Sequence, residues 1–99
     1  MQMNVLIASS AIIARSYAIL DWGWRLKNLN PLILENIERE TVKYIPITGV
    51  YGLKGLKKGK LYYIMDGLER YPNDLQFLAD EMKMWNVIRH PTNEGKVNG

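Results

Sequence analysis

Residues 49–60 are the part of the chain whose residue types and spacing most clearly indicate chemistry. They place four glycines and four lysines in twelve residues, with no acidic residue among them. Lysines at this density attract anions, and glycines let the backbone turn tightly and approach another molecule closely. The P-loop pattern, Gly-x4-Gly-Lys-Ser/Thr before a helix, is absent, so these residues do not predict a mononucleotide site of that type.

Two interpretations of this basic segment stay open. The lysines could bind the phosphates of a nucleic acid without reading its sequence, while tyrosines beside them stack on bases. They could equally serve only to keep the exposed tip of a β-hairpin soluble. The residues of the nucleic-acid hypothesis are Lys54, Lys57, Lys58, Lys60, Tyr51 and Tyr62.

Enzymatic chemistry has little support in the sequence. There is no cysteine, and the single histidine, His90, precedes Pro91. No metal-binding motif occurs, so we expect no catalytic residue, no metal and no cofactor. One alternative is kept, because Glu81 and Lys83 have the acid-x-lysine spacing of metal-dependent nucleases. On a helix, however, side chains two positions apart diverge.

Hydrophobic spacing predicts the elements that position these residues. Residues 4–28 fit one helix, or a short strand followed by a helix. A short second helix is expected from Asn30 and Pro31 to about residue 40. Residues 41–51 and 60–65 are rich in β-branched and aromatic side chains, which predicts a β-hairpin with the basic, glycine-rich segment at its tip.

A last helix is expected to begin at Asn73, with Gln76 completing a capping box. Its apolar face is formed by Leu75, Leu78, Met82 and Trp85. The predicted fold class is therefore α+β, with this C-terminal helix packed on a small antiparallel sheet. Residues 1–89 are expected to form a single domain, and residues 90–99 a flexible tail.

The first predicted helix carries more apolar surface than one packing partner needs. A chain of 99 residues has a thin core, and its three tryptophans and six tyrosines belong to residue types that are enriched at interfaces. We therefore expect a homodimer. The residues expected at its interface are Ile12, Ile19, Trp22 and Leu26.

The chain resembles the small orphan proteins of archaeal filamentous and rod-shaped double-stranded DNA viruses (lipothrixviruses and rudiviruses). The residues behind the resemblance are the Ile/Leu/Tyr-rich segment 11–24, the predicted hairpin 44–63 and the predicted helix 75–85. The resemblance implies a thermostable, dimeric viral accessory protein without an assigned biochemical role, and it transfers no site residues. It also implies the host cytoplasm as location and another viral or host protein as partner.

The net charge and the first apolar run argue against some protein classes. The net charge is +3, which is small for a dedicated nucleic-acid binder. The apolar run at residues 5–14 is too short to span a membrane. A secretion signal would require a lysine or arginine before this run, and none precedes it. We therefore expect a non-enzymatic protein-interaction module, with nucleic-acid binding and then nuclease activity as the alternatives.

Overall fold

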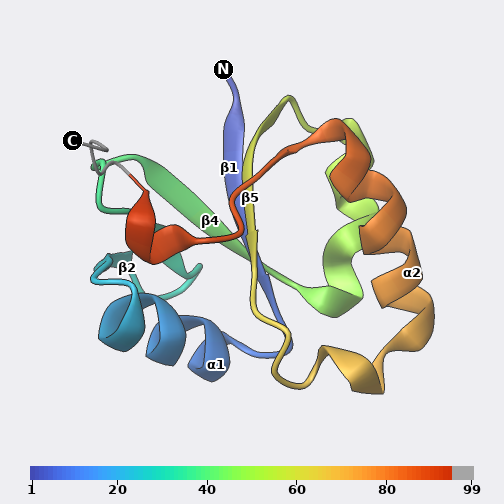
Figure 1. Cartoon of the computed structure of the whole chain (residues 1–99), viewed down its shortest axis with the longest axis horizontal. Helices are drawn as coiled ribbons and strands as arrows, with labels where there is room; N and C mark the ends of the chain where they lie inside the picture. The colour runs from blue at the N-terminus through green and yellow to red at the C-terminus, as the bar shows by residue number, and fades with distance from the viewer. Residues whose placement is uncertain (95–99) are drawn as a thin grey trace.

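In the computed structural model, which describes residues 1–94, strand β1 (Met3–Ala8) lies at the centre of a six-stranded mixed sheet (Figure 1). The strand order is β2-β3-β4-β1-β5-β6. Strands β4, β1, β5 and β6 run parallel, whereas β2 and β3 add an antiparallel hairpin beside β4. The bounds of the other strands are β2 Arg25–Asn28, β3 Ile33–Glu35, β4 Thr41–Pro46, β5 Lys58–Tyr63 and β6 Asn86–Val87.

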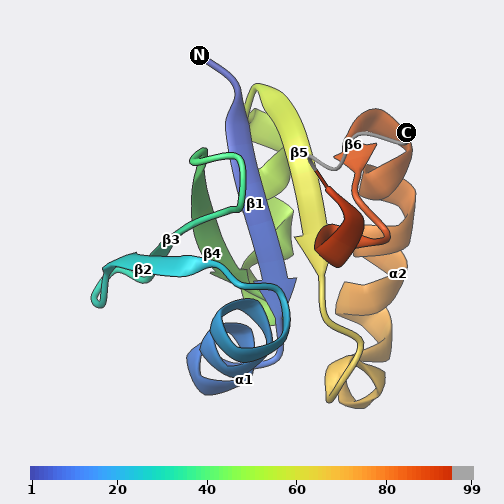
Figure 2. The same cartoon turned by 60° about the vertical axis from the view of Figure 1, so that its left-hand side comes forward.

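Helices cover both faces of this sheet (Figure 2). On one face the α-helix α1 continues directly into the π-helix η1. On the other face the 3-10 helix η2 lies beside α2. The bounds are α1 Ala11–Arg15, η1 Ser16–Asp21, η2 Ile47–Gly55, η3 Leu68–Arg70, α2 Pro72–Glu81, η4 Met82–Met84 and η5 Pro91–Asn93.

The core is split by the sheet into two layers. Along β1, Leu6 and Ala8 pack against the α1 face, and Val5 and Ile7 pack against the η2 and α2 face. All four side chains are buried. Strands buried on both faces are continuous apolar runs, which is why this run forms the central strand rather than the start of a helix.

The prediction of one helix over residues 4–28 is wrong, and the alternative of a strand followed by a helix describes its first two elements. The helix begins after Ser10, whose hydroxyl accepts a hydrogen bond from the backbone N–H of Ile13. It ends before Gly23, which has a φ of +74° that favours glycine. The chain then enters β2, so the mixed α/β sheet replaces the predicted small antiparallel one.

The predicted short helix at residues 30–40 is also wrong. Its apolar residues Leu32 and Leu34 are buried at period two, as in a strand. The turn from β3 to β4 is closed by Asn36, whose Oδ1 accepts from the backbone N–H groups of Glu38 and Glu40. This side chain substitutes for backbone partners and stabilises a turn where a helix was expected.

The predicted β-hairpin is wrong as well, because β4 and β5 do not pair with each other. Each pairs with one edge of β1. The intervening residues form η2, where Ile47, Val50 and Leu53 are all buried. A 3-10 helix has three residues per turn, so this spacing of three directs all of them toward the sheet.

The C-terminal helix is confirmed as α2, and its predicted apolar residues pack in the core layer of that face. It begins at Pro72 rather than Asn73, without a side-chain cap. Residues 95–99 of the predicted tail lie outside the described residues. Residues 90–94 contact the sheet through Glu94, while the flexibility of the tail stays a prediction. None of the helices in residues 1–94 combines the length and apolar character that crossing a membrane requires.

Candidate functional site

The strand order changes direction between β1 and β5. The chain passes from β1 to β4 on one side of β1, and then from β4 to β5 on the other side. The helices that follow the carboxyl ends of β1 and β5, α1 and α2, lie on opposite faces of the sheet. The connections therefore diverge at the carboxyl ends of β1 and β5. Ligands of open α/β sheets bind in the crevice at such a point, so it is the candidate site.

A first pocket, here called the loop pocket, lies at this point and has a volume of about 270 Å³. The hydroxyl of Ser9 donates to the backbone oxygen of Asp66 at 3.1 Å and ties the ends of the two strands together. A Cβ on Gly67 would lie 2.6 Å from Ser9 Oγ, so only glycine permits this approach. The pocket is lined by Ser9, Ser10, Ile13, Asp66, Gly67, Arg70 and Tyr71.

A second pocket, here called the aromatic pocket, shares Asp66 with the loop pocket and has a volume of about 330 Å³. It lies on the α1 face, between η1 and the segment that follows β6. Three aromatic residues and one arginine are among its lining residues. The full lining is Tyr17, Trp22, Tyr63, Ile64, Met65, Asp66, Ile88, Arg89 and Pro91.

Hydrogen bonds orient the polar groups of the aromatic pocket. The hydroxyl of Tyr17 donates to Asp66 Oδ2 at 3.2 Å, and this bond to the carboxylate raises the pKa of Tyr17. On the other side, Arg89 Nη1 donates to the hydroxyl of Tyr63 at 3.1 Å. Trp22 packs edge-on against Trp24, with 5.1 Å between ring centroids. The pocket thus has a carboxylate, a guanidinium group and a packed aromatic side chain, Trp22.

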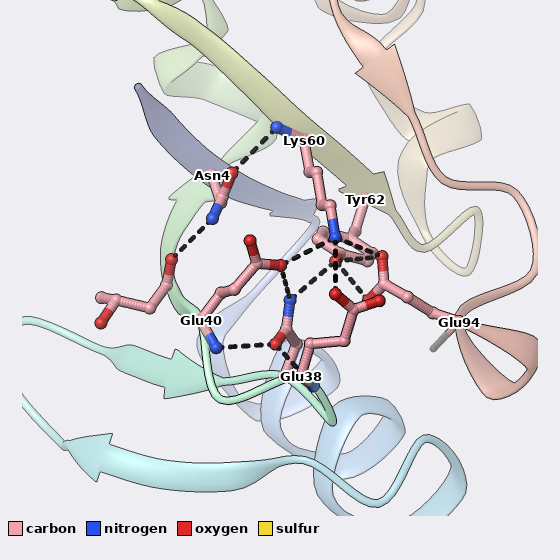
Figure 3. Close-up of polar contacts among 8 residues, drawn as sticks. Asn4, Glu38, Glu40, Lys60, Tyr62 and Glu94 are labelled. Atoms are coloured by element: carbon pink, nitrogen blue, oxygen red, sulfur yellow. Dashed lines mark hydrogen bonds and ion pairs between the residues drawn. The ribbon is translucent and has the colours of Figure 1, made fainter. Parts of the chain in front are cut away.

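A different polar group lies on the same face near the amino end of β5 (Figure 3). We call Asn36, Glu38, Glu40, Lys60, Tyr62 and Glu94 the amino-end cluster. Lys60 Nζ is 2.7 Å from Glu40 Oε1, 3.2 Å from Glu94 Oε2 and 3.6 Å from Glu38 Oε2. The hydroxyl of Tyr62 donates to Glu94 at 2.6 Å and accepts from Asn36 Nδ2 at 3.0 Å.

The charges within the amino-end cluster are only partly balanced, because one lysine faces three glutamates. Hydrogen bonds from Lys60 and Asn36 lower the pKa of Glu40. Partial burial opposes ionisation of Lys60, but its bonds to Glu40 and Glu94 raise its pKa overall. Burial and the bond to Glu94 raise the pKa of Tyr62 far above its usual value. The cluster is filled by the chain's own side chains, which makes it a structural element rather than an open site.

The four lysines of the basic segment do not form one surface. Between β1 and β5 the register changes from Met3↔Lys58 to Val5↔Leu61, which leaves one extra residue in β5. This bulge directs Lys58 toward Glu81 on the α2 face, at 3.2 Å, and Lys60 toward the opposite face. Lys54 and Lys57 are exposed.

The bulge depends on two neighbouring residues. Asn4 Oδ1 accepts from the backbone N–H of Lys60, and Asn4 Nδ2 donates to the backbone oxygen of Thr41 (Figure 3). A Cβ on Gly59 would lie 2.6 Å from both Asn4 Oδ1 and the backbone oxygen of Met3. Gly59 therefore allows close contact between strands, a role that its place in a glycine-rich segment did not indicate.

The two tyrosines of the nucleic-acid hypothesis also lie apart. Tyr51 is exposed, and its hydroxyl donates to Asp74 Oδ1 at 2.6 Å. Tyr62 is fully buried. Of the six proposed residues, those that face solvent are Tyr51, Lys54 and Lys57, and nucleic-acid binding by this segment stays a prediction.

Of the residues predicted at a dimer interface, Ile12 and Ile19 line the outer side of α1 and η1, whereas Trp22 packs against the core of the α1 face. Ile12 is 73% exposed, whereas Ile19 and Trp22 are partly buried and Leu26 is exposed on β2. Leu20 is 80% exposed, and it was not among the predicted interface residues although it lies eight positions after Ile12. An outer groove of about 330 Å³, here called the outer stripe, is lined by Ile12, Arg15, Ser16, Ile19 and Leu20.

The residues of the nuclease alternative have separate partners. Glu81 is buried, pairs with Lys58 and accepts a hydrogen bond from Trp85 Nε1. Lys83 is exposed and pairs with Asp80 at 3.8 Å. Within residues 1–94, no group of three or more acidic, histidine or cysteine side chains is arranged to hold a metal ion.

Sequence reasoning missed the crevice, because its residues come from positions far apart in the chain. Asp66 and Gly67 were recognisable as a turn, and Ser9 and Ser10 as hydroxyls after an apolar run. Correct assignment of β1 and β5 as parallel neighbours would have brought them together. No protein-family model matches the chain, and no curated protein or solved structure matches it.

Proposed function

We propose that this protein is a homodimeric protein-interaction module, with the outer stripe as the contact between copies. The observation that carries the proposal is the exposure of Ile12 and Leu20, at 73% and 80%, on one side of a helix. No other helix or strand of residues 1–94 lies across that side in Figures 1 and 2. Contiguous apolar surface rimmed by polar groups marks interaction sites.

Opposite charges in and beside the outer stripe favour a second copy as the occupant. Arg15 lies within the stripe, between Ile12 and Leu20, and its buried Nε has no hydrogen-bond partner within residues 1–94. Asp21 lies just beyond Leu20 and makes no ion pair in that part of the chain. In a two-fold contact the same surface is used twice, so Arg15 of each copy would meet Asp21 of the other.

The spacing of these charges suits an antiparallel contact. Arg15 and Asp21 are six positions apart on the continuous helix formed by α1 and η1, which leaves room for Ile19 and Leu20 between the two ion pairs. The apolar centre would then supply most of the binding free energy and the flanking charges the register. A viral setting, with a further viral or host protein as partner, follows from the resemblance to small virus proteins and is part of the proposal.

The test is the mass in solution, measured by light scattering or sedimentation over concentrations from about 1 to 100 μM. We expect a dimer that Leu20→Glu weakens by at least about tenfold, because a charge replaces an apolar contact. Met84→Glu is the matched control: Met84 is 58% exposed but lies on η4, so its dimer should persist. Circular dichroism verifies folding of each variant.

A charge swap provides the sharper measurement. Arg15→Glu should dissociate the dimer, and the double variant Arg15→Glu/Asp21→Arg should restore it, because the pairs re-form in reverse. A monomer at about 100 μM, or equal weakening by Leu20→Glu and Met84→Glu, would contradict the proposal.

A further inference from the structure

The geometry points to a second site: we infer that the loop pocket and the aromatic pocket together bind a mononucleotide. The two pockets share Asp66 and lie at the point where the strand order reverses. Their volumes of about 270 and 330 Å³ are in keeping with a small ligand rather than a dinucleotide or a polymer, since ligand sites measure roughly 300–1,000 Å³. This site is separate from the outer stripe and does not depend on dimerisation.

The loop pocket supplies groups for the phosphate. Arg70 is exposed beside Ser10 and Gly67 and makes no ion pair within residues 1–94. A guanidinium group binds phosphate through two parallel hydrogen bonds. Ser10 Oγ already accepts from the N–H of Ile13, so its proton is left to donate to an anion.

The aromatic pocket supplies the walls for a planar ring. Trp22 is held by packing against both Trp24 and Tyr62, so a wall for stacking exists before a ligand arrives. Tyr17 also lines the pocket, whereas the side chain of Tyr63 packs with the core layer of the opposite face. Stacking on aromatic side chains accepts every base, because each base has a π-face.

Asp66 lies between the phosphate end and the ring end, where a ribose would be. The Tyr17 hydroxyl holds Asp66 Oδ2 on the side of the aromatic pocket, so the carboxylate is turned away from the phosphate groups. A carboxylate accepts hydrogen bonds from two hydroxyls at once, which matches the neighbouring 2′ and 3′ hydroxyls of a ribose. Arg89, next to Tyr63, can stack over the ring or donate to its polar edge.

The probes are adenosine 5′-monophosphate and uridine 5′-monophosphate, titrated by calorimetry and followed by tryptophan fluorescence of the full chain. We expect saturable binding of one nucleotide per chain with a dissociation constant below about 1 mM. Adenosine alone should bind more weakly, because it lacks the group that contacts Arg70. Inorganic phosphate should compete with the nucleotide only at higher concentration, because it lacks the ring.

Two variants locate the site and one controls for charge. Arg70→Gln should weaken binding of adenosine 5′-monophosphate by about tenfold while leaving adenosine unaffected. Asp66→Asn should weaken both. Lys57→Gln removes an equally exposed cation of the basic segment, and binding should be unchanged.

Three outcomes would overturn the inference. One is the absence of saturable binding of both nucleotides at about 5 mM. The second is equal weakening by Arg70→Gln and Lys57→Gln, which would indicate nonspecific attraction to positive charge. The third is a nuclear magnetic resonance titration in which the nucleotide shifts other backbone amide signals but not those of Ser10 and Trp22.

Discussion

The amino-end cluster and the two pockets at the carboxyl ends of β1 and β5 hold similar groups in opposite states. At the amino end, Lys60, Tyr62 and three carboxylates are bonded to one another, and Glu94 is only 5% exposed. At the carboxyl end, Asp66, Arg70 and Arg89 surround two open pockets. The chain supplies its own counter-charge at one end and leaves space for an external one at the other. Residue types alone therefore do not distinguish a structural cluster from a binding site, whereas occupancy by the chain's own atoms does.

The largest expected effect is at the amino end. Lys60→Met should lower the free energy of unfolding by about 2 kcal/mol, because the mostly buried Glu94 and its neighbours would lose their cation. Urea denaturation measures this change. Lys57→Met, at an exposed lysine two residues before the bulge, is the control and should change stability by less than about 0.5 kcal/mol. Equal losses would mean that the amino-end cluster contributes nothing specific.

A pH dependence separates the two ends further. Because the folded pKa of Glu40 is lowered by Lys60 and Asn36, its contribution is fully present above the ordinary glutamate pKa. It is lost as the pH falls through the lowered value. The stability difference between the native protein and Glu40→Gln should therefore be largest near pH 7 and shrink toward about pH 3.

The neighbouring groups Glu38, Glu94, Lys60 and Tyr62 are present in both proteins of this comparison. Denaturant unfolding at several pH values gives the measurement. Glu69→Gln, at an exposed glutamate on the short helix η3 that makes no ion pair within residues 1–94, is a matched control that should change stability by less than about 0.5 kcal/mol at pH 7. A Glu40→Gln difference that grows as the pH falls would reverse the assigned sign.

The smallest effect is expected at the carboxyl end. Arg70→Gln should change the free energy of unfolding by less than about 0.5 kcal/mol, because Arg70 is exposed and makes no ion pair within residues 1–94. Thermal unfolding without adenosine 5′-monophosphate measures the change in stability. Unfolding in its presence measures the loss of nucleotide binding, since a ligand stabilises only the state that binds it. A loss comparable to that of Lys60→Met would show that this end is structural too.

Part of the fold was accessible from local pattern. Leu75 and Leu78 lie on α2 at the predicted helical spacing, whereas α2 ends at Glu81, so that Met82 lies on the 3-10 helix η4 and Trp85 follows it; all four pack in the same core layer. Residues 5–8 gave an ambiguous signal, since a continuous apolar run fits both a buried strand and a buried helix. The apparent hairpin was misassigned because two β-rich segments separated by a turn signal also fit two strands on either side of a third.

The sequence by itself determined which segments are apolar, where helix α2 lies, and that the first helix carries apolar residues on its outer side. Tertiary structure alone decided that β4 and β5 flank β1, that a bulge sends Lys58 and Lys60 to opposite faces, and that Glu94 meets Tyr62 across 32 positions. The physical reason is range: propensity and periodicity act over a few neighbours, whereas strand pairing and the filling of a polar cluster are settled by competition among distant segments for the same hydrogen bonds and the same space.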